Sequence, residues 1–114
     1  MMYKGGCHCG HIEFEVEGDL HGVAECNCSI CSKRGALWWF VPRDQVHFST
    51  PESTLSTYQF GKKRIKHHFC PVCGCAPLGT STYNGVEMAA INVRCLEDVD
   101  LSALTVKKVD GRSL

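Results

Sequence analysis

Three cysteines in the stretch CNCSICSKRGALWWF stand close enough in sequence to bind one metal ion. They are Cys26, Cys28 and Cys31, and together they form a C-x-C-x-x-C motif. In an extended chain, residues two positions apart point to the same side, so the sulfurs of Cys26 and Cys28 can reach one metal. Structural zinc sites have four protein ligands, whereas catalytic zinc sites keep one position for water or substrate. A motif that stops at three cysteines therefore favours a zinc ion with an exchangeable fourth ligand.

The type of ligand narrows the chemistry of such a site. Three thiolates leave Zn²⁺ with a net negative charge, so the ion is a weaker Lewis acid than one held by three neutral histidines. It can still bind a fourth thiol and hold it as the thiolate, which is the nucleophilic form. The motif thus predicts attack of a small thiol on an electrophile. Lys33 and Arg34 follow the motif directly and could attract a carboxylate of that thiol, although a solvated turn explains them equally well.

A distant residue could instead complete this site and make it structural. Four side chains are candidates for that role: Cys75, Cys95, His67 and His68. In RIKHHF, His67 shares a strand face with Ile65 and Phe69, which favours a core position for this imidazole. Cys95 fits better as a small buried hydrophobic residue than as a ligand, and the role of Cys75 stays open.

Four other cysteines form two pairs that together make a tetrahedral ligand set. GGCHCGH carries the C-x-C pair Cys7 and Cys9, and FCPVCGC carries the C-x-x-C pair Cys70 and Cys73. Four thiolates are the usual ligands of a closed structural zinc site. They also bind iron–sulfur clusters, but nothing in the sequence indicates electron transfer. We therefore expect two zinc ions per chain, one structural and one catalytic.

The elements that position these cysteines have the periodicity of strands. In HIEFEVEG, apolar and acidic residues alternate, as in a half-buried strand. Further strands are predicted in GALWWFVP, VHFS, RIKHHF, EMAAINVRCL and TVKKV, and TPESTLSTYQFGKK is expected to form a loop, a strand and a glycine turn. The one helical signal is DVDLSALT, where Asp100 could cap a single turn. Trp38, Trp39 and Phe40 are expected in the core on one face, with one ring lining a pocket. The sequence thus predicts an all-β fold of short strands.

Length and composition limit the class of protein. The chain has 114 residues, which predicts one domain over residues 1–114. Its 12 basic and 12 acidic side chains balance, which disfavours a nucleic-acid partner. No apolar run approaches the roughly 18 residues of a membrane span, and no signal peptide is visible, so we expect a cytoplasmic protein. Nine cysteines could form disulfides, but an odd number in a reducing compartment favours metal binding.

Five motifs occur in an order that resembles a known family: GGCHCGHIEFEVEG, CNCSICSKRGALW, YQFG, HHFCPVCGC and INVRCL. The chain resembles the glutathione-dependent formaldehyde-activating enzyme family, whose domain is shared with centromere protein V. The resemblance implies a β-tent of small antiparallel sheets stapled by zinc. It implies a structural zinc on the two outer cysteine pairs and a second zinc on Cys26, Cys28 and Cys31.

The resemblance also implies an activity. The prototype of the family is assigned the addition of glutathione to formaldehyde, which gives S-(hydroxymethyl)glutathione, and is classed as a carbon–sulfur lyase. The implied partners are glutathione or another small thiol and a small aldehyde. Two alternatives are a non-catalytic zinc-stabilised interaction module, as in the centromere protein branch, and a thiol redox or metal sensor. The neutral chain disfavours the chromosome and cytoskeletal partners of that branch.

Overall fold

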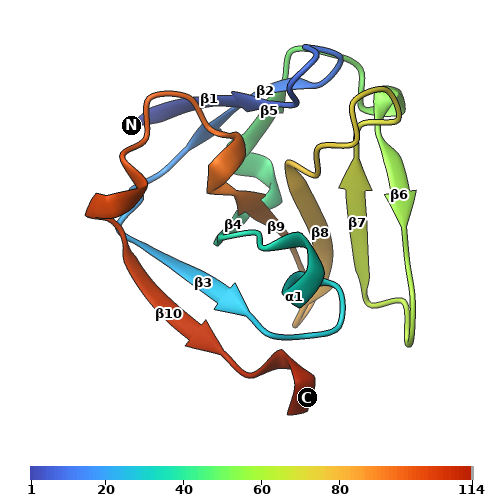
Figure 1. Cartoon of the computed structure of the whole chain (residues 1–114). Coiled ribbons are helices and arrows are strands. Elements are labelled where there is room, and N and C mark those ends of the chain that lie inside the picture. Colours follow the sequence, from blue (N-terminus) through green and yellow to red (C-terminus); the bar gives the residue numbers. More distant parts are fainter. Residues whose placement is uncertain (114) are drawn as a thin grey trace.

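The computed structural model describes residues 1–113, and these form strands with very little helix. The strands are β1 (Met2–Gly6), β2 (Glu13–Glu17), β3 (Gly22–Cys26), β4 (Trp38–Pro42), β5 (Val46–Phe48), β6 (Ser56–Tyr58), β7 (Ile65–Phe69), β8 (Leu78–Tyr83), β9 (Val86–Asn92) and β10 (Thr105–Val109). One α-helix, α1 (Cys31–Arg34), has a single turn, and the other helical segments are 3₁₀ turns. In Figure 1 β1, β2 and β5 lie together at the top, with β3 and β10 at the lower left and β7 and β6 at the right. The predicted all-β class is confirmed.

A three-stranded antiparallel sheet contains the N-terminal strand, in the order β1-β2-β5. The alternation read from the sequence is visible in β2, where Phe14 and Val16 are buried while Glu13 and Glu17 are exposed. Ile12, just before the strand, is also fully buried. Burying these three apolar side chains stabilises the fold by about 1.5–3 kcal/mol each.

A seven-stranded sheet contains the remaining strands, in the order β10-β3-β4-β9-β8-β7-β6. All of its pairs are antiparallel except β10 with β3, which run parallel, with Val109 opposite Cys26. The structure thus has a small antiparallel sheet of three strands, as the family resemblance implied, and a larger mixed sheet of seven. Parallel neighbours require a crossover connection, and the chain between Cys26 and Thr105 provides it.

All seven predicted strands are present, and three further strands were missed. The segments of β1, β3 and β8 read MYKGG, GVAEC and LGTSTY. Glycine and small polar residues weaken the alternation in these segments, so their pairing depends on neighbouring strands. The helical signal in DVDLSALT is a 3₁₀ turn, η4 (Leu101–Ala103), in which the Asp100 carboxylate accepts a hydrogen bond from the Ser102 N–H at 3.0 Å.

The three consecutive aromatic residues do not share one environment. Trp38 and Trp39 are each only 7% exposed, whereas Phe40 is 58% exposed. Successive residues of a strand point to opposite faces, so Trp39 enters the main core and Trp38 enters a second cluster with Cys31 and Ala36. The prediction that all three lie in the core on one face is therefore wrong.

No helix within residues 1–113 has the length and apolar character needed to cross a bilayer.

Candidate metal centres

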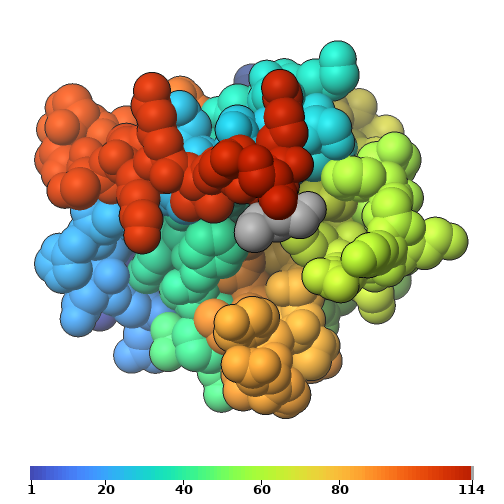
Figure 2. All heavy atoms as spheres, turned by 90° about the horizontal axis from the view of Figure 1, so that it is seen from below, coloured from blue at the N-terminus to red at the C-terminus, as the bar shows by residue number. Residues whose placement is uncertain are grey.

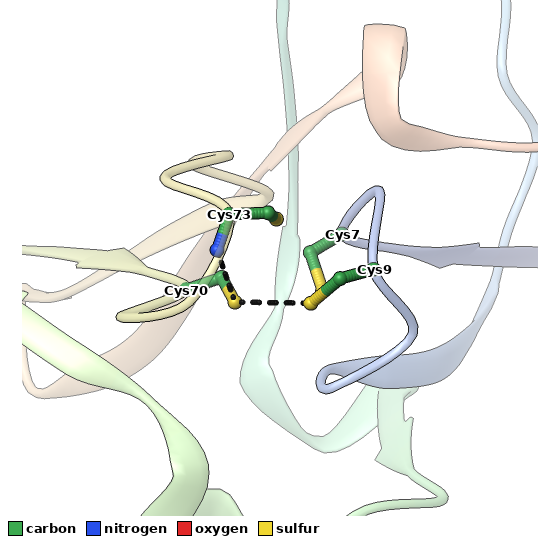
Figure 3. Close-up of side chains that lie close together, drawn as sticks. All are labelled: Cys7, Cys9, Cys70 and Cys73. Atoms are coloured by element: carbon green, nitrogen blue, oxygen red, sulfur yellow. Dashed lines mark hydrogen bonds between the residues drawn. The ribbon is translucent and has the colours of Figure 1, made fainter.

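The first cysteine set joins two loops from distant parts of the chain. Cys7 and Cys9 follow β1, and Cys70 and Cys73 follow β7, 61 residues further along. Their side chains face one another across the gap between the loops (Figure 3). All four sulfurs lie within 4.8 Å of one another. The structure therefore brings together the four residues that the sequence pairs predicted.

The spacing of these sulfurs fits a tetrahedral metal ion. The sulfur of Cys9 lies 3.7 Å from that of Cys7 and 3.6 Å from that of Cys70. A Zn–S bond of about 2.3 Å in a regular tetrahedron places neighbouring sulfurs about 3.8 Å apart. A disulfide needs about 2.05 Å, and all nine cysteines are free thiols. The disulfide alternative is thus not supported by the structure.

Backbone amides around this set stabilise sulfur in its thiolate form. The N–H groups of Val72 and Cys73 donate to the sulfur of Cys70 at 3.3 and 3.4 Å, and that of Ile12 donates to Cys7 at 3.2 Å. Gly74, at φ +83°, allows the loop to bend around the sulfur of Cys70. A loop of this kind is suited to bind a cation through its sulfurs.

Backbone hydrogen bonds, loss of hydration and neighbouring thiols give these cysteines different pKa values. Hydrogen bonds from the backbone N–H groups of Cys75 and then Cys9 lower the pKa of Cys73 to about 5. A hydrogen bond from the His11 backbone amide lowers the pKa of Cys9. Loss of hydration and hydrogen bonds to neighbouring thiols outweigh it and raise this pKa to about 12. Four thiolates at this spacing repel one another without a cation. A divalent metal removes that repulsion, so the donor set fits a zinc-type ion.

Two further cysteines lie beside the first set. Burial, followed by the negative charges of Cys75, Cys7 and Cys73, raises the pKa of Cys95 to about 11. Cys75 accepts a hydrogen bond from the Cys70 N–H through its carbonyl oxygen at 2.9 Å. Both thiols are half-buried. Neither Cys75 nor Cys95 belongs to the second cysteine set, for which the sequence had left them as candidates.

The second cysteine set is built by one short segment. Cys26 ends β3, Cys31 begins α1, and Cys28 lies on the turn between them. The three sulfurs lie within 4.8 Å of one another, and within residues 1–113 no fourth His, Cys, Asp or Glu joins them. The set therefore has three of the four ligands of a tetrahedral site.

Trp38 supports the second set from the core side. Its indole Nε1 donates a hydrogen bond to the sulfur of Cys31 at 3.3 Å, and the Cys28 N–H donates to Cys26 at 3.4 Å. Burial raises the pKa of Cys31 to about 12, with the nearby charges of Cys28 and Cys26 adding to the rise and Trp38 opposing it. As in the first set, negative sulfurs this close together repel one another, and a bound divalent cation would remove that repulsion. This hydrogen bond was missed from the sequence, where the only signal is a tryptophan seven residues after a cysteine.

The two predicted basic residues lie on the helix that Cys31 begins. Lys33 and Arg34 are both exposed on α1. The Arg34 guanidinium lies over the ring of Phe69, 6.0 Å from its centroid, which fixes its position. The helix itself ends at Gly35, whose carbonyl oxygen accepts a hydrogen bond from Arg94 Nε at 3.2 Å.

The two histidines offered as fourth ligands lie elsewhere. His67 is 7% exposed and stacks on Phe60, with ring centroids 5.5 Å apart, so its expected core position is confirmed. His68 is held by two hydroxyl groups, Thr57 Oγ1 at 2.9 Å and Thr80 Oγ1 at 2.7 Å. Both imidazoles are thus engaged in packing and hydrogen bonding.

Comparisons with known proteins identify the family of this chain. Residues 2–108 match the family model described as glutathione-dependent formaldehyde-activating enzyme. The chain is also similar to a Rhodobacter sphaeroides protein whose crystal structure was solved as a structural genomics target. The two chains are 32% identical over 91% of this chain and 99% of the other, with a TM-score of 0.78. This protein belongs to the glutathione-dependent formaldehyde-activating enzyme family.

Proposed function

We propose that this chain is a zinc-dependent enzyme of the carbon–sulfur lyase type, which joins glutathione or another small thiol to formaldehyde or a small aldehyde. The reverse reaction uses the same site. One observation carries the proposal: the second cysteine set offers three ligands within residues 1–113, whereas the first offers four. Catalytic zinc sites keep such a free position and structural ones do not. Family membership supplies the class of substrates.

The first set has a structural role in this proposal. It connects the loop after β1 with the loop after β7, 61 residues apart. Cys70 is 1% exposed and belongs to the main hydrophobic core, so the ion would be anchored to that core. A structural zinc of this kind contributes about 10 kcal/mol or more to folding. Residues 1–114 would then fold as one zinc-stapled domain.

The second set has the catalytic role. Cys26, Cys28 and Cys31 would hold the zinc ion, whose positive charge would favour the thiolate form of a substrate thiol. In the reaction a carbon–sulfur bond forms, the carbonyl π bond breaks, and the proton lost by the thiol ends on the new hydroxyl oxygen. Trp38 orients Cys31 through its 3.3 Å hydrogen bond and draws some negative charge from that sulfur.

The basic residues of α1 would position the thiol rather than react with it. Lys33 is exposed on the helix that Cys31 begins, so its ammonium group can bind a glutathione carboxylate. Arg34 is already held against Phe69, and its guanidinium offers a second, more rigid contact. Holding a thiol beside the aldehyde turns an encounter in solution into a positioned attack.

We propose a cytoplasmic location, supported by nine cysteines that are all free thiols in the structure. A reducing compartment keeps thiols in that state and also supplies glutathione.

Exchange spectroscopy by NMR tests the activity at equilibrium. Formaldehyde and glutathione are mixed with wild-type protein, with Cys31→Ser, or with Cys75→Ser, which changes a thiol outside both sets. We expect wild type and Cys75→Ser to accelerate exchange between free and hydroxymethylated glutathione. Cys31→Ser should match the rate without protein. Exchange at the background rate in every sample, across several thiols and aldehydes, would rule out the enzyme and favour a zinc-stabilised interaction module or a thiol sensor.

A further inference from the structure

The C-terminal turn of the chain lies directly against the second cysteine set. Strand β10 runs parallel to β3, and its last residue, Val109, is opposite Cys26. Both segments leave the sheet at this point, and residues 111–113 form the 3₁₀ turn η5 (Gly111–Ser113). In Figure 1 the red turn η5 lies below α1, and Figure 2 shows the red segment running beside residues coloured cyan. Two distant parts of the sequence thus meet at this set.

Asn27, the residue between Cys26 and Cys28, fastens this turn in place. Its backbone N–H donates to the Val109 carbonyl at 3.2 Å, and its side-chain Nδ2 donates to Asp110 Oδ1 at 3.0 Å. Its Oδ1 accepts from the Arg112 N–H at 3.0 Å. The three hydrogen bonds use the backbone donor, the side-chain donor and the side-chain acceptor of one residue.

A fourth hydrogen bond stiffens the turn itself. The Ser113 hydroxyl donates to the second carboxylate oxygen of Asp110 at 2.7 Å. Asp110 therefore links Asn27 on one side to Ser113 on the other. Since the residue that holds the turn stands between two metal-binding positions, the turn and the sulfurs are fixed relative to each other.

Gly111 brings the backbone of the turn close to the sulfur of Cys26. A Cβ atom at this position would lie closer than 3.0 Å to the sulfur of Cys26 and 3.3 Å from the Cβ of Cys28. The φ of Gly111 is outside the left-handed region, so an L-residue could adopt this backbone conformation without strain. Glycine is thus required here for space and not for conformation.

We propose that residues 110–113 form a fixed wall of the second centre, which slows loss of its metal and limits the size of the thiol that can approach it. Gly111 determines the size of thiol that is admitted, and Asn27 is the residue that positions the wall. The wall consists of residues beyond the family match, which ends at residue 108. The inference deepens the proposed function, because it takes the second set as the thiol-binding site.

Metal release to a chelator tests the wall without measuring activity. The samples are wild type, Gly111→Ala, a chain that ends after Val109, and Gly22→Ala. Gly22 lies at the other end of the β3–β10 pair, where an added Cβ meets the Thr105 carbonyl oxygen at an ordinary 3.5 Å. Of the two expected metal ions, one should pass to the chelator faster than the other. We expect the release rate of this faster ion to rise about 10-fold in Gly111→Ala and in the shortened chain. Gly22→Ala should behave as wild type, and equal release from all four proteins would overturn the proposal.

Alkylation of Cys26 tests whether the wall limits the size of a reagent that reaches the second set. This test also works if the purified protein carries no metal there. The same proteins are treated with iodoacetamide or with a bulky maleimide, and modification of Cys26 is followed by mass spectrometry. In the shortened chain, which lacks the wall, the rate of Cys26 modification should rise more for the bulky maleimide than for iodoacetamide. An unchanged ratio of the two rates would contradict the proposal. If the ratio shifts while no thiol–aldehyde exchange is catalysed, the wall is supported and the enzymatic function fails.

Discussion

The indole N–H of Trp38 donates a hydrogen bond to the sulfur of Cys31 at 3.3 Å, from a side chain that is 7% exposed. Trp38→Phe keeps most of the buried ring and removes the donor. We expect the affinity of the second set for zinc to fall about 10-fold, as is typical when a partner of a metal ligand is lost. Competition against a coloured chelator measures this affinity, and a thermal melt checks that the fold persists.

Trp39→Phe is the matched control for this change. Trp39 is equally buried and neighbours Trp38, but its ring packs against Tyr3, with centroids 5.5 Å apart. Its loss should reduce the free energy of unfolding and leave the zinc affinity of the second set unchanged. If both variants weaken zinc binding equally, the effect comes from packing and the hydrogen bond has no special role.

Metal content tests whether both sets are filled. One set of four sulfurs and one of three should give about two zinc ions per chain under reducing conditions. Elemental analysis of the purified protein measures this ratio. A reproducible value near one, in protein never exposed to a chelator, would remove the second zinc.

Two cysteine substitutions separate the roles of the sets. Cys73→Ser removes one of four ligands that join distant loops, and should unfold the protein, because structural zinc contributes about 10 kcal/mol or more. Cys31→Ser should leave a folded chain with one zinc and no activity. Thermal melts and metal analysis distinguish the two. Equal loss of stability in both variants would refute the division into a structural and a catalytic centre.

The buried imidazole of His67 should make stability depend on pH. Burial, and then the charge of Arg34, lowers the pKa of His67 from its ordinary value of 6.5. Above pH 6.5 the ring is neutral in the folded and unfolded states. As the pH falls through 6.5 the unfolded chain binds the proton first, so stability declines until the pH passes the lower folded pKa.

Urea denaturation between about pH 8 and about pH 5 measures this dependence. His67→Gln should flatten the slope relative to wild type, while His47→Gln, at an exposed position, should not. Protonation of metal-binding thiolates lowers stability in all three proteins, so only the difference between slopes is informative. A slope in His67→Gln as steep as in wild type would disprove the role of this imidazole.

Local patterns in the sequence were sufficient to predict which cysteines form each set and where most strands lie. C-x-C and C-x-x-C spacings place sulfurs on one side of a short segment, whatever the rest of the chain does. Likewise, the alternation in HIEFEVEG determines which side chains of β2 are buried. These features depend on residues a few positions apart, so they can be read without knowing the fold.

Contacts between distant segments required the tertiary structure. Trp38 and Phe40 point to the same face of β4, yet the first is buried and the second is 58% exposed, because burial depends on what packs over each position. The parallel pairing of β10 with β3 brings Gly111 against Cys26, although MYKGG, GVAEC and the C-terminal residues carry no pattern that specifies their neighbours. The sequence by itself determined which sulfurs could bind metal. Only the folded chain decided what surrounds them, since such contacts arise from packing across the whole sheet.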